Sequence, residues 1–281
     1  MKIIKALCLL VAFFASCHVF AEKTFTMEIG QFEKLKINSD ISVIYRNLPD
    51  STGLARYTAP ADMKDLFLLT NKGKGTLRVQ VNQTQWSTQE LPVLYVYSDF
   101  LSSVESSSDR LVLIDNPAPC ASFSVRQIGN GEIVVNNLKC TNLTAGILTG
   151  NGTISLSGRC ANANLKMVGA GQIMADRMPA DNVKCSILGT GSIGCWPVDN
   201  LSVKGLGSTK IYYKGHPNVK KTGGGKLFEL PDDSSQDYEQ AGTEVTTFNE
   251  PEPEEDHEPA YEEEVDEEPD DDAPTVVTKD E

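Results

Sequence analysis

The sequence is short of histidine, and this shortage excludes whole classes of function. Only three of its 281 residues are histidines. One lies near the start of the chain, one lies near its end, and His216 alone falls in the middle, beside Pro217. A Ser-His-Asp triad or a histidine-rich metal site would therefore depend on His216, whose place in a turn next to proline favours a structural role. The sequence thus predicts no catalytic residue, no metal and no cofactor.

Long apolar runs are also missing after the first 21 residues, and a membrane span needs ~20 apolar residues. The chain opens with Lys2 and Lys5, a short apolar stretch and a small residue at Ala21, which is the pattern of a cleaved signal peptide over residues 1–21. The alternatives are lipoprotein processing at Cys17 and an uncleaved anchor. We expect an exported protein of the periplasm, cell surface or medium, with no transmembrane segment in the mature chain.

The two ends of the sequence differ in charge. Residues 231–281 hold 22 Asp and Glu and one Lys, whereas the rest holds 17 acids and 24 Lys and Arg. The formal net charge of −14 therefore divides into −21 on this tail and +7 on the rest. Self-repulsion, low hydrophobicity and repeated proline predict a disordered acidic tail. Such a tail would serve as a solubilising spacer, or it would bind loose polycations or calcium.

Pairs of glycines, with one residue between them, recur along the second half of the chain. The pairs are Gly129 and Gly131, Gly150 and Gly152, Gly169 and Gly171, Gly189 and Gly191, Gly205 and Gly207, and Gly223 and Gly225. Each pair lies between two short runs in which apolar and polar residues alternate, as in strands with one buried face. A phosphate-binding glycine loop occurs once and opens a helix, so the repetition argues against a nucleotide site.

A unit of strand, glycine corner, strand and polar turn that recurs about every 20 residues is typical of a β-solenoid. Each unit would form one coil and stack on the next at ~4.8 Å, burying a column of Ile, Leu and Val. The glycines would be needed because a Cβ there would strike a neighbouring coil, and because a tight corner can require a positive φ. We therefore predict an all-β domain over residues 22–230, whose less regular first half forms the first coils and covers the open end.

Three segments resemble the head GIN domain family, a family of auto-transporter adhesin heads whose function is otherwise unknown. They read FEKLKINSDISVIY, MKDLFLLTNKGKGTLRVQV and LSVKGLGSTKIYYKGHPNVKKTGGGKLFEL. The resemblance covers about residues 29–229 and implies an exported, right-handed parallel β-helix from a Gram-negative bacterium. It implies no established ligand and supplies no catalytic residues. The acidic tail departs from the family pattern.

Lysines flank the inward-facing residues before the later glycine corners, at Lys166, Lys184, Lys204 and Lys220. We expect them to form a basic ladder on one outer face, where they can meet an anionic glycan, lipopolysaccharide or the protein's own tail. The alternative is a solvated face that discourages edge pairing. Aromatic residues that can stack on sugars are few: Trp86, Trp196, Tyr212 and Tyr213.

Cysteine recurs with the length of one unit. Cys120, Cys140 and Cys160 are spaced by 20 residues, so the three should occupy the same turn on consecutive coils, within the Cα separation that a disulfide accepts. Three stacked thiols allow one bond at most, and parallel side chains strain it, so we expect either three reduced thiols or one bond between neighbours. Cys185 and Cys195 fall at inward positions, and we expect both to be free and buried.

Polysaccharide-active β-helices need clustered acids, and the acids of the repeat region scatter over different parts of their units. Asp176 and Asp181 share one predicted turn around Pro179. We therefore predict an exported, non-enzymatic module of the cell envelope that acts in adhesion or in binding a glycan or another surface component. A polysaccharide-active enzyme and a purely structural envelope protein are the alternatives. The sequence predicts no nucleic-acid partner and leaves the oligomeric state open.

Overall fold

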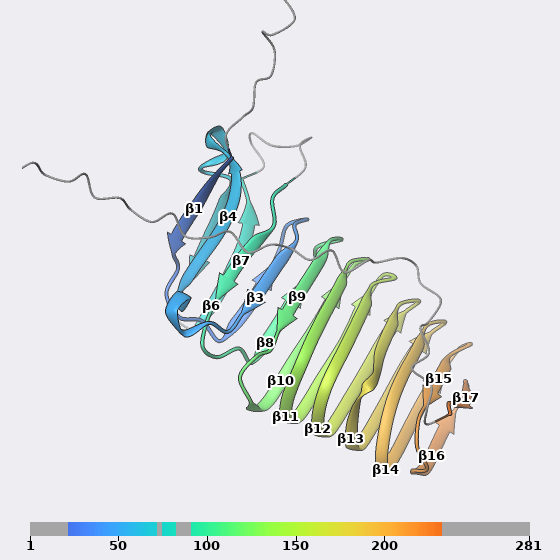
Figure 1. The fold of residues 1–281 in the computed structure, drawn as a ribbon. Coiled ribbons are helices and arrows are strands. Elements are labelled where there is room, and N and C mark those ends of the chain that lie inside the picture. Colours follow the sequence, from blue (N-terminus) through green and yellow to red (C-terminus); the bar gives the residue numbers. More distant parts are fainter. Residues whose placement is uncertain (1–21, 72–74, 83–90, 232–281) are drawn as a thin grey trace, which may run out of the picture.

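The computed structural model describes residues 22–71, 75–82 and 91–231 (Figure 1). Within these ranges the chain forms strands and two short 3-10 turns, η1 (Pro49–Ser51) and η2 (Ala61–Met63). The described residues include no helix that is long and apolar enough to cross a membrane. The predicted all-β class is confirmed. The predicted signal peptide with Cys17, Trp86 and the predicted tail after its first residue lie outside the described residues.

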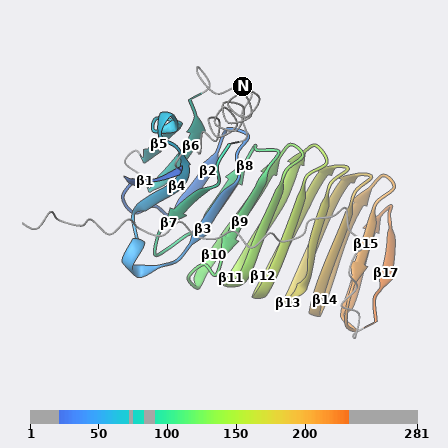
Figure 2. The same cartoon turned by 45° about the horizontal axis from the view of Figure 1, so that its top comes forward.

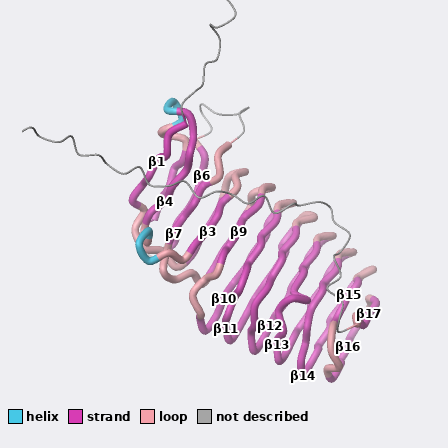
Figure 3. Tube along the Cα trace, in the orientation of Figure 1, coloured by secondary structure: helices cyan, strands magenta, loops and turns pink. Residues whose placement is uncertain are grey.

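Parallel strands stack coil upon coil through the second half of the chain (Figures 1 and 2). They are β10 (Cys120–Ile128), β11 (Glu132–Thr149), β12 (Thr153–Gly169), β13 (Gln172–Gly189), β14 (Ser192–Leu206), β15 (Lys210–Tyr213), β16 (Asn218–Gly223) and β17 (Lys226–Glu229). Each of β10 to β13 pairs in parallel with the strand that follows it, β14 pairs with both β15 and β16, and β15 pairs with β17. Figure 3 shows loops at the corners of this stack. The predicted parallel β-helix is therefore confirmed.

The core of the solenoid consists of inward columns built from equivalent residues of successive units. One column holds Ile133, Ile154, Ile173, Ile193 and Ile211, and all five are fully buried. Removing one such side chain from water contributes about 1.5–3 kcal/mol. The alternation in the sequence places these residues inward because successive side chains of a strand point to opposite faces.

The first coils do not follow the order of the sequence. Strands β2 (Lys34–Ile37) and β3 (Val43–Arg46) lie between two coils that come later in the chain. On one side they pair in parallel with β6 (Thr76–Val81) and β7 (Leu94–Tyr97). On the other they pair with β8 (Ser103–Ser106) and β9 (Leu111–Asp115), which continue to β10 and β11. The chain thus forms the coil of β2 and β3, runs outward to form the end coil of β6 and β7, and then returns past β2 and β3 to form β8 and β9.

Antiparallel strands cover this N-terminal end, as predicted. β1 (Glu22–Glu28) pairs with β4 (Leu54–Pro60), β4 pairs with β7, and β5 (Phe67–Asn71) pairs with β6. Tyr57 lies at the centre of this cover. Its ring stacks on Phe25 at 5.0 Å and meets Phe67 edge-on at 4.8 Å, and its hydroxyl donates to the carbonyl of Met63 at 2.9 Å.

At the C-terminal end of the solenoid, a lysine occupies a position that is apolar in the earlier coils. Lys221 follows Val203 at an inward position of the last coil, yet it is exposed, and its Nζ donates to the carbonyl of Gly225 at 2.7 Å. Val219, at the next inward position, remains 43% exposed. A lysine at a core position ends the apolar column and opposes the stacking of a further coil.

The predicted role of the corner glycines holds, with one correction. A Cβ would approach a neighbouring coil within 3 Å at eleven of the twelve glycines, Gly129 being the exception at 3.2 Å. At Gly189 the φ is +137°, and a Cβ would lie 2.1 Å from the carbonyl oxygen of Gly169. In the last two pairs, however, the first glycine lies two residues before the place that Gly189 holds.

The shift follows from the register of the last coils. Leu188 pairs with Leu206, so Gly207 takes the place of Gly189, and Thr209 takes the place of Gly191. Gly205 instead pairs with Gly223. The shift escapes a sequence pattern because two residues restore the same inward and outward alternation.

Candidate functional site

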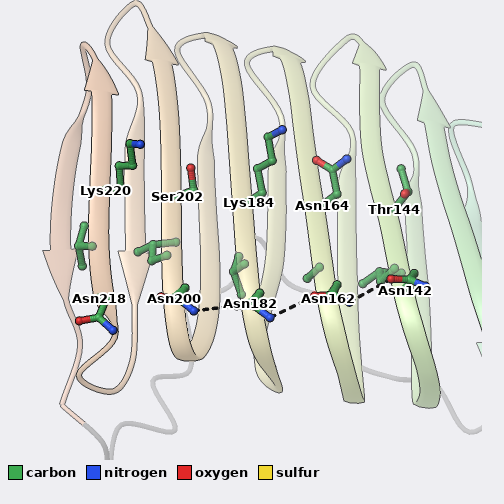
Figure 4. A pocket seen from close by; sticks show the side chains of 15 residues that line it. Asn142, Thr144, Asn162, Asn164, Asn182, Lys184, Asn200, Ser202, Asn218 and Lys220 are labelled. Atoms are coloured by element: carbon green, nitrogen blue, oxygen red, sulfur yellow. Dashed lines mark hydrogen bonds between the residues drawn. The ribbon is translucent and has the colours of Figure 1, made fainter.

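One broad side of the solenoid is formed by five parallel strand segments, residues 142–148, 162–168, 182–188, 200–206 and 218–224 (Figure 4). They read NLTAGIL, NANLKMV, NVKCSIL, NLSVKGL and NVKKTGG. Together they contain five lysines and no Asp or Glu. We call the outward side chains of these segments the lysine face.

The first outward column of the lysine face is an asparagine ladder. The amide Nδ2 of Asn162 donates to Oδ1 of Asn142 at 3.1 Å, Asn182 donates to Asn162 at 3.2 Å, and Asn200 donates to Asn182 at 2.8 Å. Asn218 continues the column in the last coil (Figure 4). The repeat suits the amide, because coils stacked at ~4.8 Å bring its donor to the acceptor of the coil before it.

The predicted basic ladder lies on this face, but the four lysines form two columns and not one. Lys184 pairs with Ser202, which pairs with Lys220. Two residues further along each strand, Lys166 pairs with Ser186, which pairs with Lys204. Counted from the asparagine that opens each segment, Lys184 and Lys220 are the second residue on, whereas Lys166 and Lys204 are the fourth. Both positions point outward because side chains alternate.

A groove of about 650 Å³ runs along the asparagine ladder and the column of Lys184 and Lys220 (Figure 4). All four lysines are exposed. Asn164 precedes Lys184 in the same column, and its Oδ1 is buried without a hydrogen-bond partner among the described residues. An unsatisfied buried acceptor costs about 1–3 kcal/mol, so this oxygen would gain from a ligand that donates a hydrogen bond.

Apolar side chains form the last outward column, one or two residues before the corner glycines. Leu148, Val168, Leu188 and Leu206 are 48%, 45%, 54% and 68% exposed, and the last three pair with one another in register. A second groove, of about 620 Å³, lies between this column and the lysines at 166 and 204. Adjacent exposed apolar side chains of this kind are typical of interaction sites.

Sequence reasoning from the glycines missed both the asparagine ladder and the apolar column. A signal for the first is present, because an asparagine opens each of the five segments at spacings of 20, 20, 18 and 18 residues. The same count gives the correct register for the last two coils. The lysines and the asparagines come together only because every segment occupies the same side of its coil.

The acids that shared a predicted turn have separate cationic partners. Asp176 is buried, and its Oδ2 lies 3.9 Å from Nζ of Lys214, whose ammonium group also lies 5.7 Å from the centre of the Trp196 ring. Asp181 instead lies 3.5 Å from the guanidinium of Arg159 at the surface. The part of the chain that the structure describes contains no cluster of three or more His, Cys, Asp or Glu arranged to hold a metal.

His216, Tyr212 and Tyr213 are not part of the lysine face. Nδ1 of His216 is 3.1 Å from Oε1 of Glu229, and both side chains are exposed. Tyr212 stacks on Phe228 at 5.1 Å, and Tyr213 donates to Glu229 at 3.2 Å. The two tyrosines lie on β15 and Phe228 and Glu229 lie on β17, so these aromatic side chains do not reinforce the lysines.

The cysteines lie where the repeat predicts them. Cys120 pairs with Cys140, and Cys140 pairs with Cys160, and all three are free in the structure. A hydrogen bond with Cys160, together with burial, raises the pKa of the Cys140 thiol, and the same hydrogen bond lowers the pKa of Cys160. The predictions for Cys185 and Cys195 are confirmed, because both are free and fully buried. A hydrogen bond with Cys185 and then burial raise the pKa of Cys195.

Comparison with known proteins gives a family and a fold. Residues 31–217 match the family described as "Putative auto-transporter adhesin, head GIN domain". No curated protein matches the chain.

Similar solved structures include the following three. A "putative adhesin" from Bacteroides fragilis is 21% identical, with a TM-score of 0.67 over 75% of this chain and 97% of that chain. Another, from Parabacteroides merdae, is 22% identical, with a TM-score of 0.62 over 74% and 96%. A "putative lipid binding protein" from Parabacteroides distasonis is 17% identical, with a TM-score of 0.57 over 74% and 96%. At these identities the likeness shows the fold alone.

Proposed function

The chain belongs to the head GIN domain family, and from this membership and the chemistry of the lysine face we propose that it is an exported, non-enzymatic adhesion module that binds an anionic glycan. One observation carries the proposal. Two columns of exposed lysines lie beside a hydrogen-bonded asparagine ladder, on strand segments that hold no acid. Such a surface offers cations to carboxylate or sulfate groups and amides to sugar hydroxyls.

The spacing of the lysines suits a polymer. Lys184 and Lys220 stand two coils apart, which is about 9.6 Å along the solenoid axis, and Lys166 and Lys204 repeat this spacing in the neighbouring column. A chain of sugars with an anionic group on alternate residues presents its charges at a comparable repeat. Exposed ion pairs contribute about 0.2–1 kcal/mol each, so four of them give weak binding that depends on salt and gains from several copies of the ligand.

Asn164 supplies the directional part of the site. Its buried Oδ1 lacks a donor within the described residues, and it lies in the column that carries Lys184. Asn164 lines the groove, so a turn of its amide towards the groove would let a sugar hydroxyl donate to this oxygen and remove the cost of an unsatisfied acceptor. We therefore expect acidic glycans with free hydroxyl groups to bind more tightly than simple polyanions such as polyphosphate.

A glycan array, with the full chain applied at about 0.15 M salt, where exposed charges beyond ~8 Å are screened, tests the proposal. We expect retention by uronic-acid or sulfated glycans and not by their neutral counterparts. The variant K166Q/K184Q/K204Q/K220Q should lose at least tenfold in affinity. The matched control K23Q/K64Q/K139Q/K210Q removes four exposed lysines outside the lysine face and should bind as the wild type does. Equal binding by the two variants contradicts the proposal. So does a failure to bind any acidic glycan, both by the wild type and by a variant in which the Asp and Glu of residues 232–281 are changed to Asn and Gln.

An anionic amphiphile is the second candidate ligand, favoured by the apolar column. Val168, Leu188 and Leu206 lie beside Lys166 and Lys204 along the second groove, so a chain of methylene groups can cover the apolar side chains while its acidic group meets a lysine. The Parabacteroides distasonis structure described as lipid binding has the same fold. The variant L188S/L206S would then lose binding of a long-chain fatty acid and keep binding of acidic glycans.

A further inference from the structure

The described chain ends beside the lysine face. The N–H of Leu230 donates to the carbonyl of Tyr213 at 2.7 Å, and Glu229 lies 3.1 Å from His216. His216 precedes by two residues Asn218, where the last strand of the lysine face begins. The remaining 50 residues, 232–281, therefore continue from the corner before Asn218, at the edge of the lysine face.

We infer that residues 232–281 dock on the lysine face and compete there with its anionic ligand. This inference rests on the proposed function of the face and adds to it a regulation by the chain itself. Its first support is charge. The segment holds 22 acids and one lysine, whereas the five strand segments of the lysine face hold five lysines and no acid. Charges segregated in this way within one chain attract each other over the range of the Debye length.

The neighbouring coils show why the attraction is confined to this face. One coil towards the N-terminus, Arg126 stands in the column of Lys166 and Lys204. Arg126 lies 3.7 Å from Glu105, which lies 2.6 Å from Lys36. Lys36 and Arg126 of these earlier coils already share an acid, whereas the five strand segments of the lysine face contain none. The docking surface therefore starts after β10.

The segment is long enough to cover the whole face. The face spans four coil steps from Asn142 to Asn218, which is about 19 Å along the axis. A flexible chain of 50 residues has a root-mean-square end-to-end distance of roughly 35–42 Å. Attachment at Pro231 thus holds the acids near the lysines at an effective concentration in the millimolar range, where an external glycan competes at a disadvantage.

The apolar column gives the segment a second point of complementarity. Among its acids the segment carries Phe248, Tyr261 and Val265, and the lysine face carries exposed leucines next to Lys166 and Lys204. A second copy of the protein fits the face less well, because two lysine faces repel each other. The acidic segment matches both the charge and the apolar edge.

Lysine reactivity in the full chain tests the docking directly. In a variant that we call tail-neutral, all 22 Asp and Glu of residues 232–281 are changed to Asn and Gln. Brief acetylation followed by peptide mass spectrometry should show Lys166, Lys184, Lys204 and Lys220 at least threefold less reactive in the wild type than in this variant. Lys139 and Lys210, which are exposed outside the lysine face, should react equally in both. Equal reactivity of the four lysines in the two proteins overturns the inference.

Affinity for labelled heparin, used as a polyanionic probe, tests the competition. The tail-neutral variant should bind heparin at least tenfold more tightly than the wild type at about 0.15 M salt. In the K166Q/K184Q/K204Q/K220Q background the same neutralisation should change affinity less than twofold. In the K23Q/K64Q/K139Q/K210Q background the tenfold gain should persist. Equal gains in both backgrounds would mean that the tail repels heparin without docking, and would overturn the inference.

The two proposals fail in different ways. Protection of the four lysines without heparin or glycan binding by the tail-neutral variant leaves the docking and removes the proposed function. Glycan binding that depends on the four lysines, with no protection by the tail, leaves the proposed function and removes the docking.

Discussion

The buried pair of Asp176 and Lys214 should behave as one unit in the stability of the last coils. Their side chains are each 8% exposed, and the carboxylate and ammonium lie 3.9 Å apart. Lys214 also lies 5.7 Å from the centre of the Trp196 ring, and its N–H donates to the carbonyl of Cys195 at 3.1 Å. Removing one charge leaves the other buried without its partner, whereas removing both leaves no buried charge of the pair.

The expected magnitudes follow from that difference. Lys214→Met and Asp176→Asn should each destabilise the fold by about 3–5 kcal/mol, because an unpaired buried charge is costly. For a body of about 200 residues this lowers the melting temperature by roughly 6 °C or more. The double variant D176N/K214M should lose at least about 2 kcal/mol less than the two single losses added together, since no buried charge remains.

Thermal unfolding of the full chain, followed by circular dichroism and calorimetry, measures these values. The matched control is Arg159→Met, which breaks the surface pair with Asp181, where the side chains are 69% and 39% exposed. That change should cost less than about 1 kcal/mol. If the losses of the two single variants add up in the double variant, the charges do not stabilise each other and the reasoning fails.

Three further predictions concern the corner at Gly189, the buried thiols of Cys185 and Cys195, and Tyr57 in the antiparallel cover of the N-terminal end. Gly189→Ala should destabilise by at least about 1–3 kcal/mol, because φ is +137° and the Cβ would lie 2.1 Å from a carbonyl; Gly146→Ala, with its nearest atom at 3.5 Å, is the control in thermal melts. Cys185 and Cys195 should resist native labelling and react only after denaturation, and fast native labelling of either would mean that the register is wrong. Burial raises the pKa of Tyr57 to about 12. The free energy of unfolding should therefore fall as the pH rises from about 10, where an unfolded tyrosine ionises, towards about 12. Tyr57→Phe should make this fall less steep, and an unchanged pH profile would contradict the prediction.

The glycines and the alternating residues were sufficient to predict the stacked coils. Ile133, Ile154 and Ile173 recur with the unit, and a period of two leaves them only one buried side. The same spacing placed Cys120, Cys140 and Cys160 in one column. These features are local, because each depends on what one unit repeats from the one before it.

Two features of the candidate site needed the register of the folded chain. The sequence suggested one lysine column, but Lys166 pairs with Ser186 and not with Lys184. A displacement by two residues leaves every side chain on its own side and so leaves no trace in the alternation. The amides of Asn142, Asn162 and Asn182 form a ladder only when the coils stack, since each donor and its acceptor lie 20 residues apart.

By itself, then, the sequence determined the strands, the corners and which side chains point inward, because these depend on the period of neighbouring residues. Only the tertiary structure decided which coils lie next to one another. Strands β2 and β3 lie between β6–β7 and β8–β9, and no local pattern distinguishes these partners, since every coil offers the same backbone hydrogen bonds and a similar apolar column. The choice depends on how the whole first half buries its end under β1 and β4, and that is a property of long-range packing.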